Sequence, residues 1–239
     1  MRSRHVVPMS VAALFLSTAT LPGQAIDLGR VRPPSRWQGG LQLEGAQSTG
    51  EFRRFVSDGY GVGLNLLYQP DRRSALSLRA GVDLLQYGRE SRPVCFTGIG
   101  CRIALRLATD NNILIAGIGP QLMAPTGQVR PYASGLIGVS YFFTESSLSG
   151  NSDSESFGNT TNYSDAAFAW SAGGGLYVLL RQGRHPISLD VGGQYHDNGT
   201  VSYLLPGGVR DNPDGSISVT PVRSKANMVI YRIGAGIGF

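Results

Sequence analysis

The sequence has no long apolar run and is poor in charge. No apolar stretch approaches the roughly 20 residues that a transmembrane helix needs. Charged residues make up only 15% of the 239 residues, whereas about 25% is usual in soluble domains. Glycine, in contrast, occurs 33 times. This composition disfavours a helical enzyme and is typical of a β-rich chain with tight turns. If such a chain crosses a membrane, it does so as a closed barrel, which pairs every backbone group in lipid.

Net charge and reactive motifs are also scarce. The formal net charge is +5, and removing residues 1–25, which contain Arg2 and Arg4 and no acid, leaves +3 (5 − 2). This charge is too small to predict nucleic-acid binding, and no basic run is interleaved with aromatic residues. No Gly-rich phosphate loop and no metal-ligand cluster appears, so neither a cofactor nor a metal is expected.

The only cysteines are Cys95 and Cys101. If the protein is exported to an oxidising compartment, their short spacing predicts a disulfide. The alternative is a metal site, which would need two further ligands, and no other His or Cys lies close in the sequence.

Residues 1–25 predict a secretory signal peptide. Arg2 and Arg4 give a positive start, residues 11–16 an apolar core, and residues 23–25 a small-x-small cleavage site. A short buried helix would not require these zones in this order. No cysteine follows the cleavage site, which disfavours a lipoprotein. Residues 26–239 are then expected to form one domain.

Alternation between apolar and small or polar residues predicts strands, because successive side chains of a strand point to opposite faces. It is blurred only in the fourth strand. The predicted strands are 37–48, 59–69, 75–87, 112–123, 129–144, 165–180, 187–204 and 225–239.

The last strand carries the strongest pattern. Every second residue from Val229 is apolar, including Tyr231, Ile233, Ile237 and Phe239, and the residues between them after Ile230 are Arg232 and glycines. An edge strand of a soluble sandwich is one interpretation. A membrane barrel explains the pattern better, because lipid-facing and lumen-facing residues alternate along each of its strands.

The connections between these strands alternate in length. Short turns are expected at 70–74, 124–128 and 181–186, and long links at 49–58, 88–111, 146–164 and 205–223, the last of which could be a further hairpin. Short periplasmic turns and long extracellular loops are typical of outer-membrane barrels. The sequence therefore predicts an all-β fold, an eight-stranded antiparallel up-and-down transmembrane β-barrel with its long loops outside the cell.

Over residues 36–239 this pattern resembles the small eight-stranded OmpA/OmpX-type outer-membrane proteins. Tyr231, Ile233, Ile237 and Phe239 resemble the terminal signal that the barrel-assembly machinery reads. The resemblance implies residence in the outer membrane, contact with its lipid, and insertion by that machinery. The peptidoglycan-binding function of OmpA is not expected, since no such domain follows Phe239.

The strand register assigns a set of polar side chains to the lumen. An eight-stranded barrel has an interior just wide enough for side chains to fill, and buried charges there must pair. Arg79 and Arg232 among Glu44, Asp83 and Asp190 therefore predict a charged plug; an ion gate in a narrow pore is the alternative. The remaining residues assigned to the lumen are Asn65, Gln194 and His196.

Catalysis is not expected. Residues 195–199 faintly resemble the His-x-Ser-Asn segment of lipid A deacylases, in which the histidine activates the serine. Here Asn198 stands at the nucleophile's position, and Ser202 is too far along the strand to replace it. A lipid A-modifying enzyme is thus an alternative to the expected structural or surface-interaction role.

Arginines are frequent in the long links. Arginine suits phosphate recognition, so contact with lipopolysaccharide is one interpretation; ordinary solvated loop charge is another. These residues are Arg53, Arg54, Arg89, Arg92, Arg102, Arg210 and Arg223.

Deleting Phe239 should prevent insertion, because the terminal aromatic and its apolar neighbours are expected to form the assembly signal. The variant should remain in the periplasm, degraded or aggregated, as measured by membrane fractionation against the unaltered protein. Normal insertion of the variant would contradict the assignment.

Overall fold

The computed structural model describes residues 35–71, 74–95, 104–150, 156–212 and 217–239. These residues belong to one unit, Val31–Phe239. The predicted signal peptide, 1–25, lies outside the described residues, as do Cys101 and the side chain of Cys95, so the signal peptide and the disulfide stay predictions.

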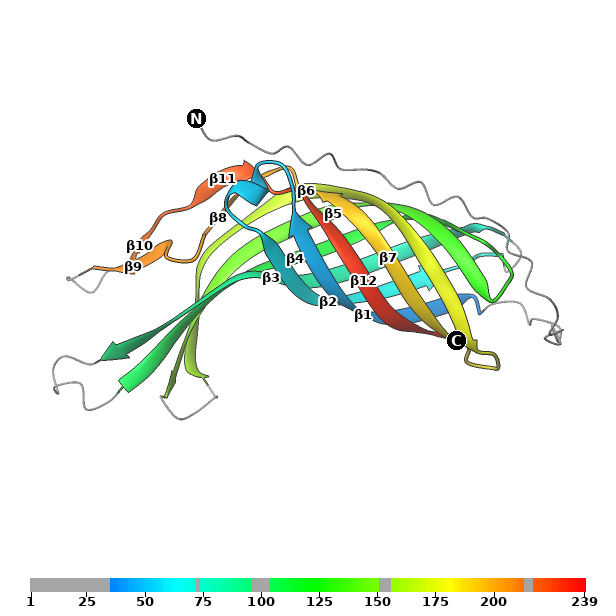
Figure 1. The fold of residues 1–239 in the computed structure, drawn as a ribbon, viewed down its shortest axis with the longest axis horizontal. Helices are drawn as coiled ribbons and strands as arrows, with labels where there is room; N and C mark the ends of the chain where they lie inside the picture. Colours follow the sequence, from blue (N-terminus) through cyan, green and yellow to red (C-terminus); the bar gives the residue numbers. More distant parts are fainter. Residues whose placement is uncertain (1–34, 72–73, 96–103, 151–155, 213–216) are drawn as a thin grey trace, which may run out of the picture. The chain divides into compact units, whose positions relative to one another are not determined.

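Eight antiparallel strands form a closed barrel in the order β1-β12-β7-β6-β5-β4-β3-β2 (Figure 1). Each barrel strand pairs with the next barrel strand along the chain, and β12 closes the ring by pairing with β1. This arrangement confirms the predicted all-β, up-and-down barrel. The barrel strands are β1 (Trp37–Ser48), β2 (Asp58–Tyr68), β3 (Leu76–Cys95), β4 (Ala104–Met123), β5 (Val129–Gly150), β6 (Ser156–Arg181), β7 (Ile187–Asp197) and β12 (Met228–Gly238).

The two ends of the barrel differ. At the short-turn end lie the turns joining β2 to β3, β4 to β5 and β6 to β7, together with the chain's C-terminus (Figure 1). There the Phe239 N–H donates to the Trp37 carbonyl at 2.9 Å. At the opposite end, the loop end, lie the long connections.

Two of the long links are mostly strand, which corrects the prediction of loops at 88–111 and 146–164. β3 and β4 stay paired to Cys95 and Ala104, and β5 and β6 to Ser149 and Ser156. The resulting hairpins extend beyond the barrel (Figure 1). These segments are rich in Ser, Thr, Asn and charged residues and show no apolar period in the sequence. Their backbones are held by regular cross-strand hydrogen bonds.

The predicted strand 187–204 is interrupted, which is a second correction. Gly199 has a φ of 61°, a conformation that favours glycine, and the chain leaves the barrel there. Beyond it, β8 (Thr200–Tyr203) pairs with β11 (Val222–Lys225), and β9 (Val209–Asp211) with β10 (Ile217–Val219). The link at 205–223 is therefore the expected hairpin. The first long link contains a 3₁₀ turn, η1 (Phe52–Arg54).

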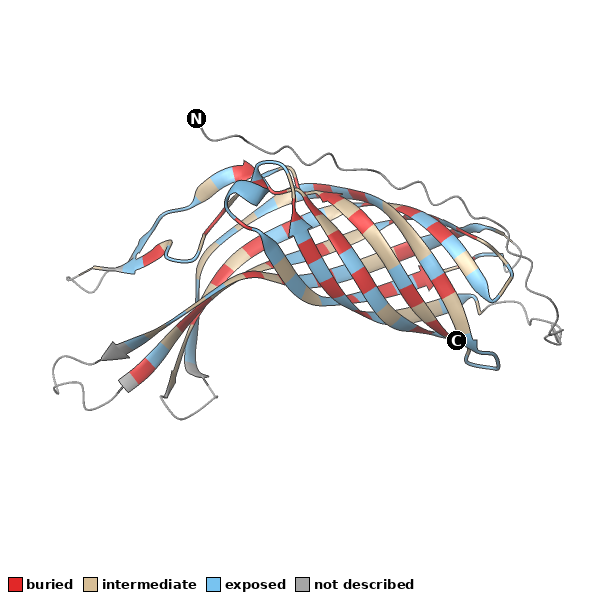
Figure 2. Ribbon diagram, viewed as in Figure 1, coloured by how far each residue is buried: buried red, intermediate tan, exposed pale blue. Residues whose placement is uncertain are grey.

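The barrel presents an apolar outer face and a buried, largely polar inner one (Figure 2). Leu43 is 65% exposed on β1, whereas its neighbour Glu44 is 5% exposed. Such a surface suits hydrocarbon rather than water. No helix among the described residues is long and apolar enough to cross a membrane.

Aromatic side chains lie near both edges of this apolar face. The rings of Trp37 and Tyr68 are 4.5 Å apart near the short-turn end, and those of Trp170 and Tyr195 are 5.9 Å apart toward the loop end. Phe142 on β5 instead points inward and is 1% exposed, because alternation along β5 places its neighbours outside.

Candidate functional site

The barrel interior is the candidate site, and the structure places all the predicted lumen residues there. Each is buried, with exposed fractions below one tenth. They are Glu44, Asn65, Arg79, Asp83, Asp190, Gln194, His196 and Arg232.

Asp190 on β7 is the centre of one polar network. Its carboxylate accepts hydrogen bonds from the Tyr132 hydroxyl, at 2.9 Å, and from the Gln42 side-chain amide. The Arg79 guanidinium lies 3.9 Å from the same carboxylate and donates to Gln121 Oε1 at 3.0 Å. That guanidinium also lies 5.7 Å from the centre of the Tyr132 ring, within cation–π range. β1, β3, β4, β5 and β7 are thereby connected across the lumen.

The other predicted charges form a second group. Arg232 donates to Gln194, which donates to Ser171. Glu44 and Asp83 both border Gly63: a Cβ built at Gly63 would lie 2.6 Å from Glu44 Oε1 and 2.7 Å from Asp83 Oδ1. The glycine therefore leaves room for two carboxyl groups to lie close together.

The predicted charge network is thus only partly ion-paired. Arg79–Asp190 is the one ion pair inside the barrel among the residues that the structure describes. Arg232 is the register partner of Glu44, yet neither Glu44 carboxylate oxygen has a hydrogen-bond partner in that part of the chain. Asp83, Gln194, His196 and Arg232 line a cavity of about 20 Å³, enough for about one water molecule. Water in this cavity can solvate these polar groups.

An apolar cluster fills the barrel at the loop end. Phe52 enters from η1 and contacts Tyr87, Phe142 and Tyr203, with ring centres 5.1–6.3 Å from its own. We call these four residues the aromatic plug. The Tyr87 hydroxyl donates to the Leu204 carbonyl at 3.0 Å. Burial raises the pKa of the Tyr203 hydroxyl, which favours its uncharged form.

The short-turn end is also filled. Leu67, Met123, Tyr132 and Tyr177 form a buried cluster, in which the two tyrosine rings are 5.0 Å apart. We call these four residues the tyrosine cluster. Polar groups thus lie between two obstructions along the barrel.

His196 is buried, with 3% of its surface exposed. Its two ring nitrogens have no hydrogen-bond partner within the described ranges. Asn198, two residues on, accepts from Ser140 and donates to the Ala226 carbonyl. Neither ring nitrogen is therefore hydrogen-bonded to a hydroxyl in that part of the chain, although Ser171 is the register partner of His196 on β6. No group of three His, Cys, Asp or Glu residues among the described positions could hold a metal ion.

The aromatic plug and three of the five side chains of the Asp190 network, Gln42, Gln121 and Tyr132, were not predicted from the sequence. Phe52 lies in one of the predicted long links, where no strand alternation assigns it to a face. The blurred alternation of β4 gave no face for Gln121. Two phenylalanines close together in this short link, Phe52 and Phe55, were the signal that could have indicated a buried ring. Tyr132 could have been assigned to the lumen, because it alternates along β5 with residues that face outward.

Replacing Arg79 by Met should strand the buried Asp190 carboxylate and lower the free energy of unfolding by about 3–5 kcal/mol. Urea unfolding in detergent micelles, followed by heat-dependent gel mobility, measures this change. The double variant Arg79→Met/Asp190→Asn removes both charges and should recover part of the loss. A double variant that is less stable than Arg79→Met would contradict the pairing.

No family model matches the sequence, and no curated protein sequence matches it either. Solved structures with a similar fold do exist. Neisserial surface protein A superposes with a TM-score of 0.50 at 12% identity, covering 86% of this chain and 98% of that one. The attachment invasion locus protein Ail of Yersinia pestis gives 0.45 at 13% identity (85% and 98% covered). OprG of Pseudomonas aeruginosa gives 0.46 at 14% (86% and 97%). Together with the closed ring of antiparallel strands, the likeness to Neisserial surface protein A shows that the chain has the fold of a small eight-stranded antiparallel barrel, as the sequence predicted.

Proposed function

We propose that this protein is an integral outer-membrane barrel with a sealed lumen, which acts through its loop end at the cell surface and carries out no catalysis. The observation that carries the proposal is the filling of the barrel at three levels: the aromatic plug, the Asp190 network and the tyrosine cluster. The narrow-pore alternative requires a continuous path past all three.

The apolar outer face supports the membrane location. In the proposed orientation the short turns face the periplasm and the loop end faces outward, as in barrels of this kind. The outer surface then contacts membrane lipid, and β12, whose Phe239 is 59% exposed on that surface, serves as the signal for the barrel-assembly machinery.

Contacts between connections support a role for the loop end as an ordered surface. The Gly207 N–H donates to Glu90 Oε2 at 2.5 Å, and the Ser202 N–H to Asp165 Oδ2 at 2.8 Å. The Lys225 N–H donates to Glu51 at 3.2 Å. These bonds join the β8–β11 region to β3, to β6 and to the first long link. A surface held in this way can bind a partner without first ordering its loops.

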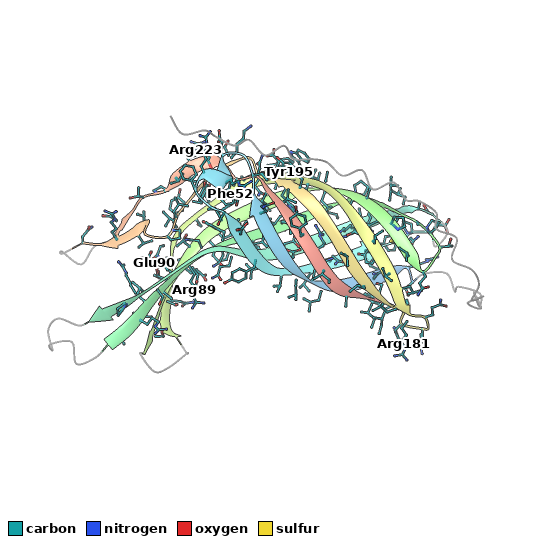
Figure 3. The ribbon with its side chains drawn as sticks, in the orientation of Figure 1. Phe52, Arg89, Glu90, Arg181, Tyr195 and Arg223 are labelled. Atoms are coloured by element: carbon teal, nitrogen blue, oxygen red, sulfur yellow. The ribbon has the colours of Figure 1, made fainter. Side chains whose placement is uncertain are left out.

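Exposed cations lie on this surface next to the apolar face. Arg53 and Arg54 on η1 and Arg223 on β11 are exposed, and Figure 3 shows Arg223 close to Phe52 of η1 at the loop end. Guanidinium groups suit phosphate oxygens. We therefore propose that these arginines contact lipopolysaccharide phosphates.

The purified protein should show little or no conductance in planar bilayers, because the lumen is filled at three levels. Replacing Phe52 by Ala removes the ring that contacts all other members of the aromatic plug, yet the Asp190 network should still block ions. The double variant Phe52→Ala/Arg79→Ala should conduct more than either single variant. Phe55→Ala, on an exposed ring of the same link, is the matched control. Stable channels in the unaltered protein would establish the pore instead.

Replacing Arg53, Arg54 and Arg223 by Gln should weaken binding of purified lipopolysaccharide by about 0.2–1 kcal/mol per arginine, as expected for exposed charge pairs. Titration in nonionic micelles gives the apparent Kd. The control Arg181→Gln/Arg184→Gln removes exposed charge from the short-turn end. Equal weakening by the control would show that only net charge matters.

A further inference from the structure

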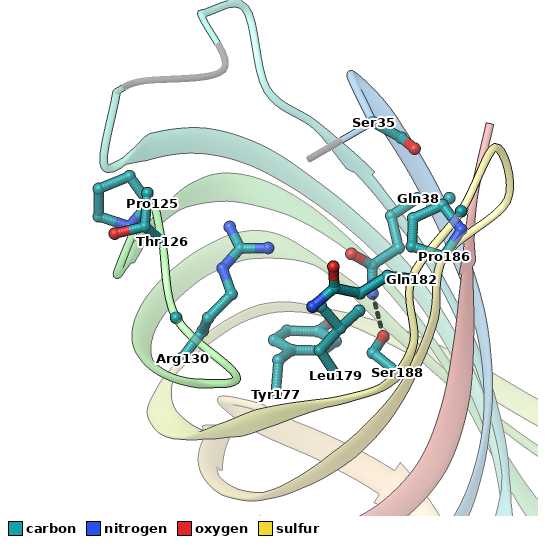
Figure 4. Close-up of a pocket in the computed structure, with 13 residues that line it drawn as sticks. Ser35, Gln38, Pro125, Thr126, Arg130, Tyr177, Leu179, Gln182, Pro186 and Ser188 are labelled. Atoms are coloured by element: carbon teal, nitrogen blue, oxygen red, sulfur yellow. Dashed lines mark hydrogen bonds between the residues drawn. The ribbon is translucent and has the colours of Figure 1, made fainter. Parts of the chain in front are cut away.

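A cavity of about 60 Å³ lies at the short-turn end of the barrel (Figure 4). Side chains from β1, β5, β6 and β7 and from the short turns surround it, among them Gln38, Arg130, Tyr177, Leu179 and Ser188. Its volume accommodates several water molecules or one small organic anion. Tyr177, which belongs to the buried cluster at this end, forms part of its lining.

Two side chains that can donate hydrogen bonds, Arg130 and Tyr177, line this cavity. Arg130 on β5 and Tyr177 on β6 are direct register partners, so their side chains leave neighbouring positions of the same inner face. Figure 4 shows both extending toward the space bordered by Gln38 and Ser188. The Gln38 side-chain amide donates to Ser188 Oγ at 2.9 Å, so that wall is already hydrogen-bonded.

Each of these two side chains has a donor group without a hydrogen-bond partner among the described residues. Arg130 Nε donates to the Ala124 carbonyl at 2.7 Å, which orients the guanidinium, but buried Nη2 has no hydrogen-bond partner in the described part of the chain. Tyr177 is only 3% exposed, and its hydroxyl also has no partner there. Its neighbour Tyr132 donates to Asp190, whereas neither ion pair of the described residues includes Arg130.

The lining specifies what such donors could bind. Arg130 carries the only formal charge among the residues that line the cavity, and Pro125, Leu179 and Pro186 add apolar surface. A guanidinium binds planar carboxylates well, because its N–H groups match their two oxygens. A monoanion neutralises the single charge, whereas a dianionic phosphate would leave an uncompensated negative charge in a largely enclosed site.

We propose that this cavity is a binding site for a small aliphatic monocarboxylate, held by Arg130 Nη2 and the Tyr177 hydroxyl with its hydrocarbon end against Pro125, Leu179 and Pro186. The site goes beyond the proposed surface role and does not depend on it. In the proposed orientation it opens toward the periplasm.

The experiment is a titration of the full mature protein in nonionic micelles with butyrate, monitored through the Arg130 side-chain Nε–Hε resonance. Butyrate should shift this resonance saturably, whereas chloride at equal ionic strength should not. Arg130→Gln should weaken butyrate binding, measured by calorimetry, about tenfold or more, because a charge-assisted hydrogen bond is lost. Tyr177→Phe should weaken it less. Arg181→Gln, which removes an exposed charge at the same end outside the cavity (Figure 3), should leave it unchanged.

Three outcomes would overturn the proposal: no saturable shift with butyrate, equal weakening by Arg181→Gln, or tighter binding of inorganic phosphate than of butyrate. Heat-dependent gel mobility checks that each variant is folded. Tyr177→Phe keeps the ring packing against Tyr132, so undiminished butyrate binding by that variant would exclude the hydroxyl even if Arg130→Gln failed to fold.

Discussion

The ladder between β12 and β1 is the interaction on which the rest of the structure depends. Without it the sheet would have two open edges, and each would carry unpaired backbone groups that hydrocarbon cannot satisfy. With it, every barrel strand has two neighbours, and the inside and outside of the ring become separate environments. The same ladder sets Glu44 opposite Arg232 and Leu43 opposite Ile233, so one register determines both the lumen and the apolar surface.

The fold could be predicted because alternation within the barrel carries a strong physical signal. An outward Leu43 and an inward Glu44 differ so much in environment that a one-residue slip would reverse every side chain. The hairpins beyond the barrel carry no such signal, since both of their faces meet water or other loops. The sequence therefore predicted a link over residues 88–95 and 104–111, although their backbones pair regularly.

Many residues of the candidate site could be assigned to the lumen from the sequence, but which of them bond to each other could not be predicted. Arg79 and Asp190 were assigned to the lumen from their faces, and they form an ion pair. That Arg232 bonds to Gln194, while Glu44 lies beside Asp83 around Gly63, depends on side-chain directions that alternation does not specify. Phe52 was missed because it reaches the lumen from a loop, where position along a strand gives no information. Arg130 and Tyr177 stayed unnoticed because neither forms a sequence motif, and only the register of β5 and β6 brings them together.

The register shifts in the long hairpins have an evolutionary consequence. The strand register shifts between Gln86 and Gly88 in β3 and between Thr144 and Glu145 in β5. Such bulges absorb an extra residue locally. Beyond them, paired insertions or deletions would lengthen or shorten a hairpin without moving a residue between lumen and lipid. The two hairpins can therefore change in length while the barrel below them keeps its alignment.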